Sequence, residues 1–205
     1  MLPWIVWGIL GLVMVSIFVA FVLERQTQSR SRLPVLGRIS DFNLTNQMGN
    51  PVTLSNLAGN VVVVNVIFTR CAGPCPKLTR QMRQVHDLVS TNLAVRFISL
   101  TADPAHDTPG VLREYGRRFP ADPARWFYLT GAKSELYRLA IDDFKFTVLD
   151  NQEKRQPDED IFIHSMKFVI LDSAARVRAY VDGDEPETVT RIMSAVSALM
   201  KEMNR

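Results

Sequence analysis

The chain has 205 residues and a formal net charge of +3, and its basic residues are scattered along the sequence. No stretch of Lys and Arg alternates with aromatic side chains, so the composition gives no support to nucleic-acid binding. Two cysteines are too few for an ordinary iron–sulfur cluster. We therefore expect neither a nucleic-acid-binding protein nor an iron–sulfur protein.

The N-terminal segment, residues 1–23, is apolar and contains no Asp, Glu, Lys, Arg or His. A helix of about 20 residues crosses a hydrocarbon core of about 30 Å. Trp4 and Trp7 lie near one end, as is common at the headgroup boundary. We predict a single transmembrane anchor over 1–24 and a polar tether over 25–36. The alternative is a cleaved signal peptide, although the segment lacks a basic start and a small-x-small cleavage site.

The orientation of this anchor is left open by its flanking charges. Arg25, Arg30 and Arg32 all follow the apolar segment. The positive-inside tendency taken alone would place the bulk of the protein in the cytoplasm. Long domains can translocate despite that tendency, so these charges do not decide the side.

The remaining chain, 37–205, is long enough for one globular domain and shows strand and helix patterns in alternation. In chain order we expect a hairpin over 39–44 and 52–54, a buried strand over 61–68, a helix over 76–90 and a strand over 95–100. A helix over 108–119 follows, with Thr108 as its cap and Pro109 in its first turn. The remaining elements are a strand over 126–129, a helix over 134–141, strands over 166–171 and 177–181, and a closing helix over 187–203. Residues 144–160 fit neither pattern clearly. This order predicts an α/β, thioredoxin-like fold with an N-terminal β-hairpin extension.

The two cysteines, Cys71 and Cys75, lie four positions apart between a predicted buried strand and a helix. Pro76 is tolerated only in the first turn of a helix, so the helix should begin at about Cys75. The free N–H groups at a helix N-terminus stabilise a thiolate, and Arg70 and Lys77 should add positive charge nearby. A thiolate pair is suited to Cu(I) or zinc. A structural disulfide or two buried thiols is the alternative.

His164 is the histidine best placed to join the two thiols as a metal ligand. It precedes a core strand whose entering loop lies against the cysteine loop in a thioredoxin-like order, and imidazole is a good ligand for copper and zinc. His86 lies within the helix that follows the cysteines, where we expect a solvated or cap-like role, and His106 should be exposed on a loop. Met82 and Met166 fit the apolar patterns of their elements, so core packing is expected for both.

Five groups of residues in this domain occur together, in order, behind the single predicted anchor. They are Phe68-Thr69-Arg70-Cys71 with Cys75-Pro76, then Phe97-Ile98-Ser99-Leu100, then Asp103-Pro104 with Asp107-Thr108-Pro109, then Trp126 to Gly131, and finally His164-Ser165. With these residues the chain resembles the Sco/SenC family, copper-handling proteins that help to assemble cytochrome c oxidase. The resemblance covers most of 37–203.

The resemblance implies a thioredoxin-like domain on the extracytoplasmic, periplasmic side of the membrane. It also implies that Cys71, Cys75 and His164 bind a copper ion for insertion into the binuclear copper centre of cytochrome c oxidase, whose copper-centre subunit would be the partner. Family members are also thought to reduce the thiols of that target site. Two positions depart from the common pattern, because Gly73 and Ile163 stand where acidic residues are frequent. Their absence is expected to alter affinity for Cu(II) more than for Cu(I).

Three functions remain open from the sequence. The first is a copper metallochaperone with redox-active thiols at Cys71 and Cys75, which is not a classical enzyme. The second is a membrane-tethered thiol–disulfide oxidoreductase without a metal, although His164 and its neighbours stand where thioredoxins place a cis-proline. The third is a structural zinc site or an assembly scaffold, although no fourth ligand for a closed zinc site is evident.

Overall fold

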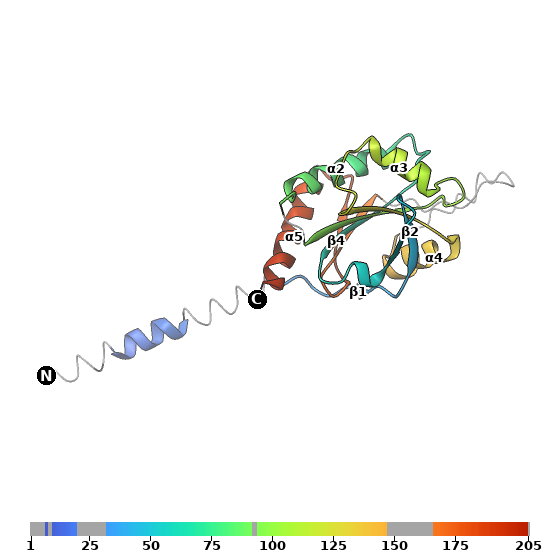
Figure 1. Cartoon of the computed structure of the whole chain (residues 1–205). Helices are drawn as coiled ribbons and strands as arrows, with labels where there is room; N and C mark the ends of the chain where they lie inside the picture. Colours follow the sequence, from blue (N-terminus) through green and yellow to red (C-terminus); the bar gives the residue numbers. More distant parts are fainter. Residues whose placement is uncertain (1–6, 8–9, 20–31, 92–93, 147–165, 205) are drawn as a thin grey trace, which may run out of the picture. The chain divides into compact units, whose positions relative to one another are not determined.

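The structure is a computed structural model of the chain (Figure 1), and it describes residues 7, 10–19, 32–91, 94–146 and 166–204. The chain divides into two compact units, Met1–Leu33 and Pro34–Arg205. In the first unit, residues 10–19 are helical and their side chains are exposed. Among the described residues, no helix combines the length and the apolar character needed to cross a membrane. Much of the anchor predicted over 1–24 and of the tether predicted over 25–36 lies outside those residues.

The second unit is built on a mixed sheet that has eight strands among the described residues. The strands are β1 (Gly37–Arg38), β2 (Asn43–Asn46), β3 (Pro51–Thr53), β4 (Val61–Ile67), β5 (Val95–Thr101), β6 (Trp126–Thr130), β7 (Lys167–Leu171) and β8 (Arg176–Asp182). Their order across the sheet is β1-β8-β7-β4-β5-β6-β2-β3. The central strands β4, β5 and β6 are parallel, and the other neighbouring pairs are antiparallel.

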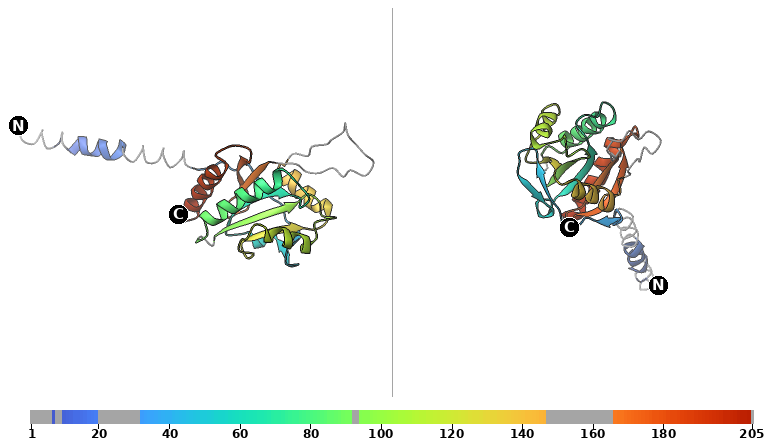
Figure 2. Two further views of the ribbon diagram at one scale, coloured as in Figure 1. Left: turned by 90° about the horizontal axis from the view of Figure 1, so that it is seen from above. Right: turned by 90° about the vertical axis from the view of Figure 1, so that its right-hand side faces the viewer.

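Helices cover both faces of this sheet, as a buried parallel centre requires (Figures 1 and 2). The helices on one face are α2 (Pro74–Leu88), α3 (Pro109–Arg117) and α5 (Thr188–Met203). On the other face lie the 3₁₀ turn η1 (Leu54–Asn56), the helix α4 (Lys133–Arg138) and the π-helical turn η2 (Leu139–Asp143). Val62, Val64 and Val66 of β4 belong to a core cluster on the α4 side, together with Leu136 and Phe144. The prediction of a central strand buried on both faces is confirmed, because every residue of β4 is buried.

Most predicted elements are present, with shifted ends. The hairpin is formed by β2 and β3, but β2 begins only at Asn43, whereas the strand was expected from residue 39. The short strand β1 was not predicted, because two residues carry no period, and it pairs with β8 at the opposite edge. The helix expected over 134–141 is present as α4, which is followed directly by the π-helical turn η2. Residues 147–160 of the ambiguous segment lie outside the described residues.

The prediction for the start of α3 is confirmed. Pro109 is the first residue of the helix, and the hydroxyl of Thr108 accepts a hydrogen bond from the amide of Val111 at 3.4 Å. This bond satisfies one of the amide groups that a helix leaves unpaired at its beginning.

The second unit begins at Pro34, which lies at the end of the sheet opposite the loop that carries Cys71, residues 68–73. The amide of Leu36 donates to the carbonyl of Val177 at 2.8 Å, and Nε of Arg178 donates to the carbonyl of Pro34 at 3.1 Å. These partners lie at the beginning of β8. The end of β8 pairs with the beginning of β7, since Asp182 is opposite Lys167. The beginning of β7 lies at the carboxyl end of β4, from which the cysteine loop emerges.

Candidate metal centre

The cysteine loop, residues 68–73, runs from the end of β4 to the first residue of α2. The amide of Cys71 donates to the carbonyl of Phe68 at 3.1 Å and closes a turn. Helix α2 then begins at Pro74, with Gly73 as its N-cap residue, so it begins one residue before the predicted start at Cys75. In the first turn, the amide of Cys75 donates to Sγ of Cys71 at 3.4 Å. The structure therefore brings the two predicted site cysteines together at the N-terminus of a helix.

The two cysteines are free thiols in different environments. Cys71 is half-buried, whereas Cys75 is only 5% exposed. Burial raises the pKa of the Cys75 thiol well above its usual value, and the hydrogen bond with the Cys71 side chain raises it further. Burial and the Cys71 hydrogen bond therefore act against the thiolate that the helix N-terminus is expected to favour at Cys75. Cys71 is the thiol that solvent and partners can reach.

The two cations predicted to support the thiols are each paired with a carboxylate. The Arg70 guanidinium donates to Oδ2 of Asp103 from Nη2 at 2.5 Å and from Nε at 3.2 Å. Nζ of Lys77 lies 2.9 Å from Oδ1 of Asp184. Each positive charge is thus compensated by a residue distant in the sequence. The expectation that both add net positive charge beside the sulfurs is corrected accordingly.

A buried carboxylate, that of Asp107, holds the cysteine loop from the segment that follows β5. Asp107 is fully buried, and its Oδ2 accepts hydrogen bonds from the amide of Thr69 at 3.1 Å and from the hydroxyl of Thr101 at 2.5 Å. The hydroxyl of Thr69 donates to its other oxygen. No role for Asp107 follows from the sequence alone. The available signal was an acidic residue directly before the Thr108-Pro109 start of a helix, on the loop that follows a core strand.

Thr79 and Tyr115 hold the first turn of α2 in place through hydrogen bonds. The hydroxyl of Thr79 donates to the carbonyl of Cys75 at 2.8 Å and lies 2.9 Å from the hydroxyl of Tyr115 in α3. Burial raises the pKa of Tyr115 to about 12, although its bond with Thr79 acts in the opposite direction. Tyr115 therefore stays neutral and joins α2 to α3 beneath the cysteines.

His164, the third predicted ligand, lies outside the described residues. The described chain resumes at Met166, whose carbonyl accepts a hydrogen bond from the amide of Gly183 at 2.5 Å. Gly183 lies against Leu78 of α2 so closely that an added Cβ would overlap the Leu78 side chain and would lie 2.7 Å from the Met166 carbonyl. The backbone of Met166 is thus bonded to a glycine that packs against Leu78 of α2.

The other candidate ligands are structural or exposed. His86 is buried at 7% exposure, with ring centroids 5.4 Å from Phe97 and 6.2 Å from Trp126. Of the solvated or cap-like role predicted for it, the solvated part is wrong, and the residue lies in the last turn of α2. His106 is exposed, and Met82 is fully buried in the core, as predicted. Met166 is half-buried. Within the described part of the chain, no three His, Cys, Asp or Glu side chains form a group that could hold a metal.

Comparison with known proteins identifies the family of the chain. The sequence profile of the SCO1/SenC family matches residues 36–201. The chain belongs to the SCO1/SenC family. The predicted resemblance is thereby confirmed, and so is an α/β fold of the thioredoxin-like Sco type.

Individual Sco relatives align over most of the described domain. The chain is 31% identical to the SCO1 protein homolog of Bacillus subtilis over 167 residues, which are 80% of this chain and 84% of that protein. The structure of BsSco, a member of the Sco family of cytochrome c oxidase assembly proteins in which a disulfide switch was identified, is 30% identical, with a TM-score of 0.69 and coverage of 82% of this chain and 97% of that one. Yeast Sco1 with copper bound is 25% identical, with a TM-score of 0.61 and coverage of 80% and 90%.

Some curated Sco relatives are considerably longer than the matched region. The mitochondrial Protein SCO2 of Saccharomyces cerevisiae is 29% identical over 80% of this chain, but the match covers only 54% of that protein. The similarity thus concerns the domain that carries Cys71 and Cys75, over the range of the family profile.

Proposed function

We propose that this Sco protein binds copper through Cys71, Cys75 and His164 and delivers it to the binuclear copper centre of cytochrome c oxidase. The observation that carries the proposal is the convergence of two free thiols at the start of α2, where the amide of Cys75 reaches Sγ of Cys71. The copper-bound structure of yeast Sco1 supports the choice of metal.

The chemistry of the donor set fits Cu(I). Two thiolates and one neutral imidazole are soft donors of the kind that Cu(I) prefers, and they give a three-coordinate site. Because the nearby cations Arg70 and Lys77 are already paired, the ion itself supplies the positive charge that stabilises the sulfurs. Burial favours the protonated form of Cys75, so copper binding must release its proton and should weaken as the pH falls.

The register of the sheet supports His164 as the third ligand. β7 runs antiparallel to β4, with Leu171 opposite Val62 and Val169 opposite Val64. The same register, continued, would bring Met166 opposite Ile67, the last residue of β4. His164 precedes Met166 by two residues, and Cys71 follows Ile67 by four. This connectivity supports the proposal that His164 lies at the same end of the sheet as the two sulfurs.

The proposed location is a membrane, with the copper domain on the extracytoplasmic side. Residues 1–23 carry no ionisable side chain, which supports an anchor over 1–24 followed by a tether over 25–36. Extraction with alkaline carbonate tests the anchor, and protease protection in intact cells tests the side. An anchored chain stays in the membrane pellet, and an extracytoplasmic domain is digested without breaking the cytoplasmic membrane.

Copper content of protein purified under anaerobic conditions tests the metal assignment. We expect one Cu(I) per reduced chain under copper-replete conditions, and loss of most of it in the His164→Ala variant. His106→Ala is the matched control, because His106 is exposed on another loop and should leave the copper content unchanged. Copper well below one per reduced wild-type chain would overturn the proposal.

Thiol–disulfide exchange is a second candidate function, and the unequal exposure of the two cysteines favours it. The accessible Cys71 thiolate would attack a target disulfide, forming a mixed disulfide and releasing one target thiol. Cys75 would then attack Sγ of Cys71 and release the second target thiol, which leaves a Cys71–Cys75 disulfide. Two electrons and two protons pass from this chain to the target.

The two functions differ in their dependence on the histidine. Reduction of a target disulfide that proceeds without metal and survives His164→Ala would favour exchange as the main role. Exchange that requires copper, or that is lost together with copper binding in His164→Ala, would favour delivery.

A further inference from the structure

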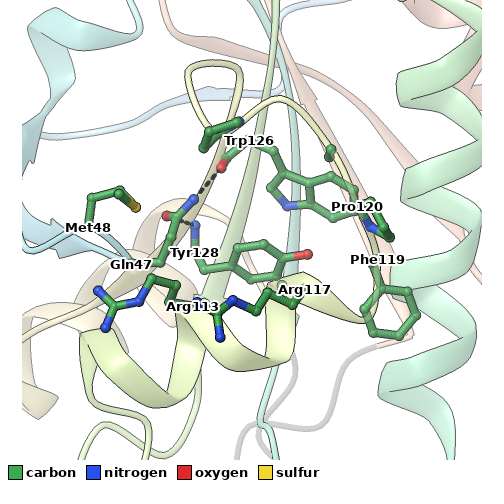
Figure 3. A pocket seen from close by; sticks show the side chains of 11 residues that line it. Gln47, Met48, Arg113, Arg117, Phe119, Pro120, Trp126 and Tyr128 are labelled. Atoms are coloured by element: carbon green, nitrogen blue, oxygen red, sulfur yellow. Dashed lines mark hydrogen bonds between the residues drawn. The ribbon is translucent and has the colours of Figure 1, made fainter.

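A pocket separate from the cysteine loop lies between α3, β6 and the turn that joins β2 to β3 (Figure 3). Its volume is about 350 Å³, within the range of roughly 300 to 1,000 Å³ found for small-molecule sites. None of its lining residues takes part in the proposed copper chemistry, so copper binding does not account for this pocket.

Aromatic side chains line the bottom of the pocket, although little of their surface is exposed, since Trp126 is 1% and Tyr128 3% exposed. The rings of Trp126 and Tyr128 are stacked with an interplanar angle of 14° and a centroid distance of 5.3 Å. Phe119 and Pro120 form a wall beside them, and Met48, which is 53% exposed, lies at the opposite side (Figure 3). Such a surface favours a planar apolar guest, because aromatic rings prefer offset stacked or edge contacts with other rings.

The backbone of β6 is not available to a guest at this edge. Gln47 places its carboxamide along the strand, where Nε2 donates to the carbonyl of Trp126 at 2.8 Å and Oε1 accepts from the amide of Tyr128 at 2.9 Å. One side chain thus replaces a neighbouring strand beyond the point where β2 pairs with Leu129 and Thr130. An extended peptide therefore cannot be added to the sheet here, and recognition has to come from side chains.

A cation that has no ion-pair partner among the described residues lies on the rim. Arg113 and Arg117 of α3 both border the pocket (Figure 3). Arg117 pairs with Glu114 at 2.6 Å, whereas Arg113 has no ion pair with any described residue. The Tyr128 hydroxyl, which points toward Phe119, is likewise without a hydrogen-bond partner in the described part of the chain. An apolar floor bordered by an uncompensated guanidinium fits a guest that carries a negative charge.

We infer that this pocket binds a flat, largely apolar organic anion, of which an aromatic carboxylate is the simplest form. The ring of the guest lies in the pocket between Met48 and the Phe119–Pro120 wall and contacts the accessible part of the Trp126–Tyr128 stack. Its carboxylate pairs with Arg113. The inference is independent of copper binding.

Binding of sodium 2-naphthoate to the full chain in phosphatidylcholine nanodiscs tests the inference. The protein carries ¹³C-methyl methionine, and the Met48 signal is assigned by its loss in Met48→Leu. We expect a saturable shift of this signal with naphthoate, and a shift that needs a higher concentration with the uncharged 2-naphthamide. Arg113→Gln should weaken naphthoate binding about fivefold and leave naphthamide binding unchanged.

Two further variants keep the result unambiguous. Arg80→Gln removes an exposed arginine of α2 that does not line the pocket and should leave binding unchanged. Ala121→Trp fills the pocket and should abolish the shift, while the unchanged signals of the other methionines report an intact fold. The inference is overturned if the Met48 signal does not move up to the solubility limit of naphthoate. It is equally overturned if Arg113→Gln binds naphthoate as the wild type does, or if naphthamide binds as tightly as naphthoate.

Discussion

The carboxylate of Asp107 accepts a hydrogen bond from the amide of Thr69 at 3.1 Å, two residues before Cys71. The donor lies on the loop after β4, and the acceptor lies on the loop after the neighbouring parallel strand β5. Since Asp107 is fully buried, the bond fixes the cysteine loop to the interior of the domain. The position of the first thiol thus depends on a residue that carries no metal-binding chemistry itself.

Asp107→Asn should weaken both the fold and copper binding. The substitution turns one acceptor oxygen into a donor that faces the hydroxyls or the amide of its partners, so we expect a loss of about 2 kcal/mol in the free energy of unfolding. Cu(I) affinity should fall about tenfold, as is typical when a group that orients a metal ligand is lost. Urea denaturation and competition with a Cu(I) chelator measure the two effects. Asp41→Asn, at an exposed position, is the control, and equal behaviour of the two variants would contradict the role of Asp107.

Gly183→Ala should disturb the segment that leads into β7. An added Cβ would overlap the side chain of Leu78 and approach the Met166 carbonyl to 2.7 Å. We expect a loss of about 1 to 3 kcal/mol in the free energy of unfolding, because overpacking a closed site costs this much. If His164 is the third ligand, as proposed, copper affinity should also fall, because His164 precedes Met166 by only two residues.

Gly37→Ala is the matched control for this change. No atom lies within 4 Å of a Cβ added at Gly37, so the methyl group is accommodated there without strain. If Gly183→Ala unfolds at the same urea concentration as Gly37→Ala, the close packing of the β8–α5 turn on α2 is not a constraint.

Gly73→Asp should tighten Cu(II) binding more than Cu(I) binding. Nothing lies within 4 Å of a Cβ added at Gly73, so there is space for the side chain. Its carboxylate adds a hard oxygen and a negative charge beside the thiols, which favours the more highly charged ion. Gly73→Asn separates charge from shape, because Asn is an equally good N-cap residue without the charge. Equal gains for both oxidation states would refute the expectation.

Asp172 should make the stability of the domain sensitive to acid. Burial alone would raise the pKa of its carboxyl group, but hydrogen bonds from Arg178, Arg176 and backbone amides hold the pKa below the usual 3.8. A lowered pKa in the folded state means that the stabilisation is complete above about pH 3.8 and is lost as the pH falls through the folded value. Asp172→Asn should cost about 3 kcal/mol at pH 7.

The pH profile distinguishes this ion pair from packing. Urea denaturation of the wild type between pH 6 and pH 2 should show a fall in unfolding free energy that is smaller in Asp172→Asn. A parallel fall in both proteins would mean that other carboxylates account for acid unfolding.

The sequence predicts this fold well where a pattern is local, and poorly where a partner is remote. The placement of Cys71 and Cys75 follows from a buried strand and a proline next to each other in the chain. The pairing of Arg70 with Asp103 and of Lys77 with Asp184 joins residues 33 and 107 positions apart, which no periodicity reveals. The charges beside the thiols were therefore assigned the wrong net effect.

The same limit applies to the buried histidine and to the pocket. The sequence predicts a solvated or cap-like role for His86, yet its helix face is covered by Phe97 and Trp126 from the sheet. The pocket combines a turn, a helix and a strand from different parts of the chain, and each taken alone has an unremarkable sequence. The strand order that brings them together arises only from the assembled sheet.

The hydrogen bond between Pro34 and β8 fixes where the chain enters this unit. Arg178 fixes the chain at Pro34, at the end of the sheet away from the cysteine loop. Within this unit, Pro34 and the two sulfurs therefore lie at opposite ends of the sheet. A partner that covers the cysteine end of this unit therefore leaves Pro34 and its bond with Arg178 uncovered.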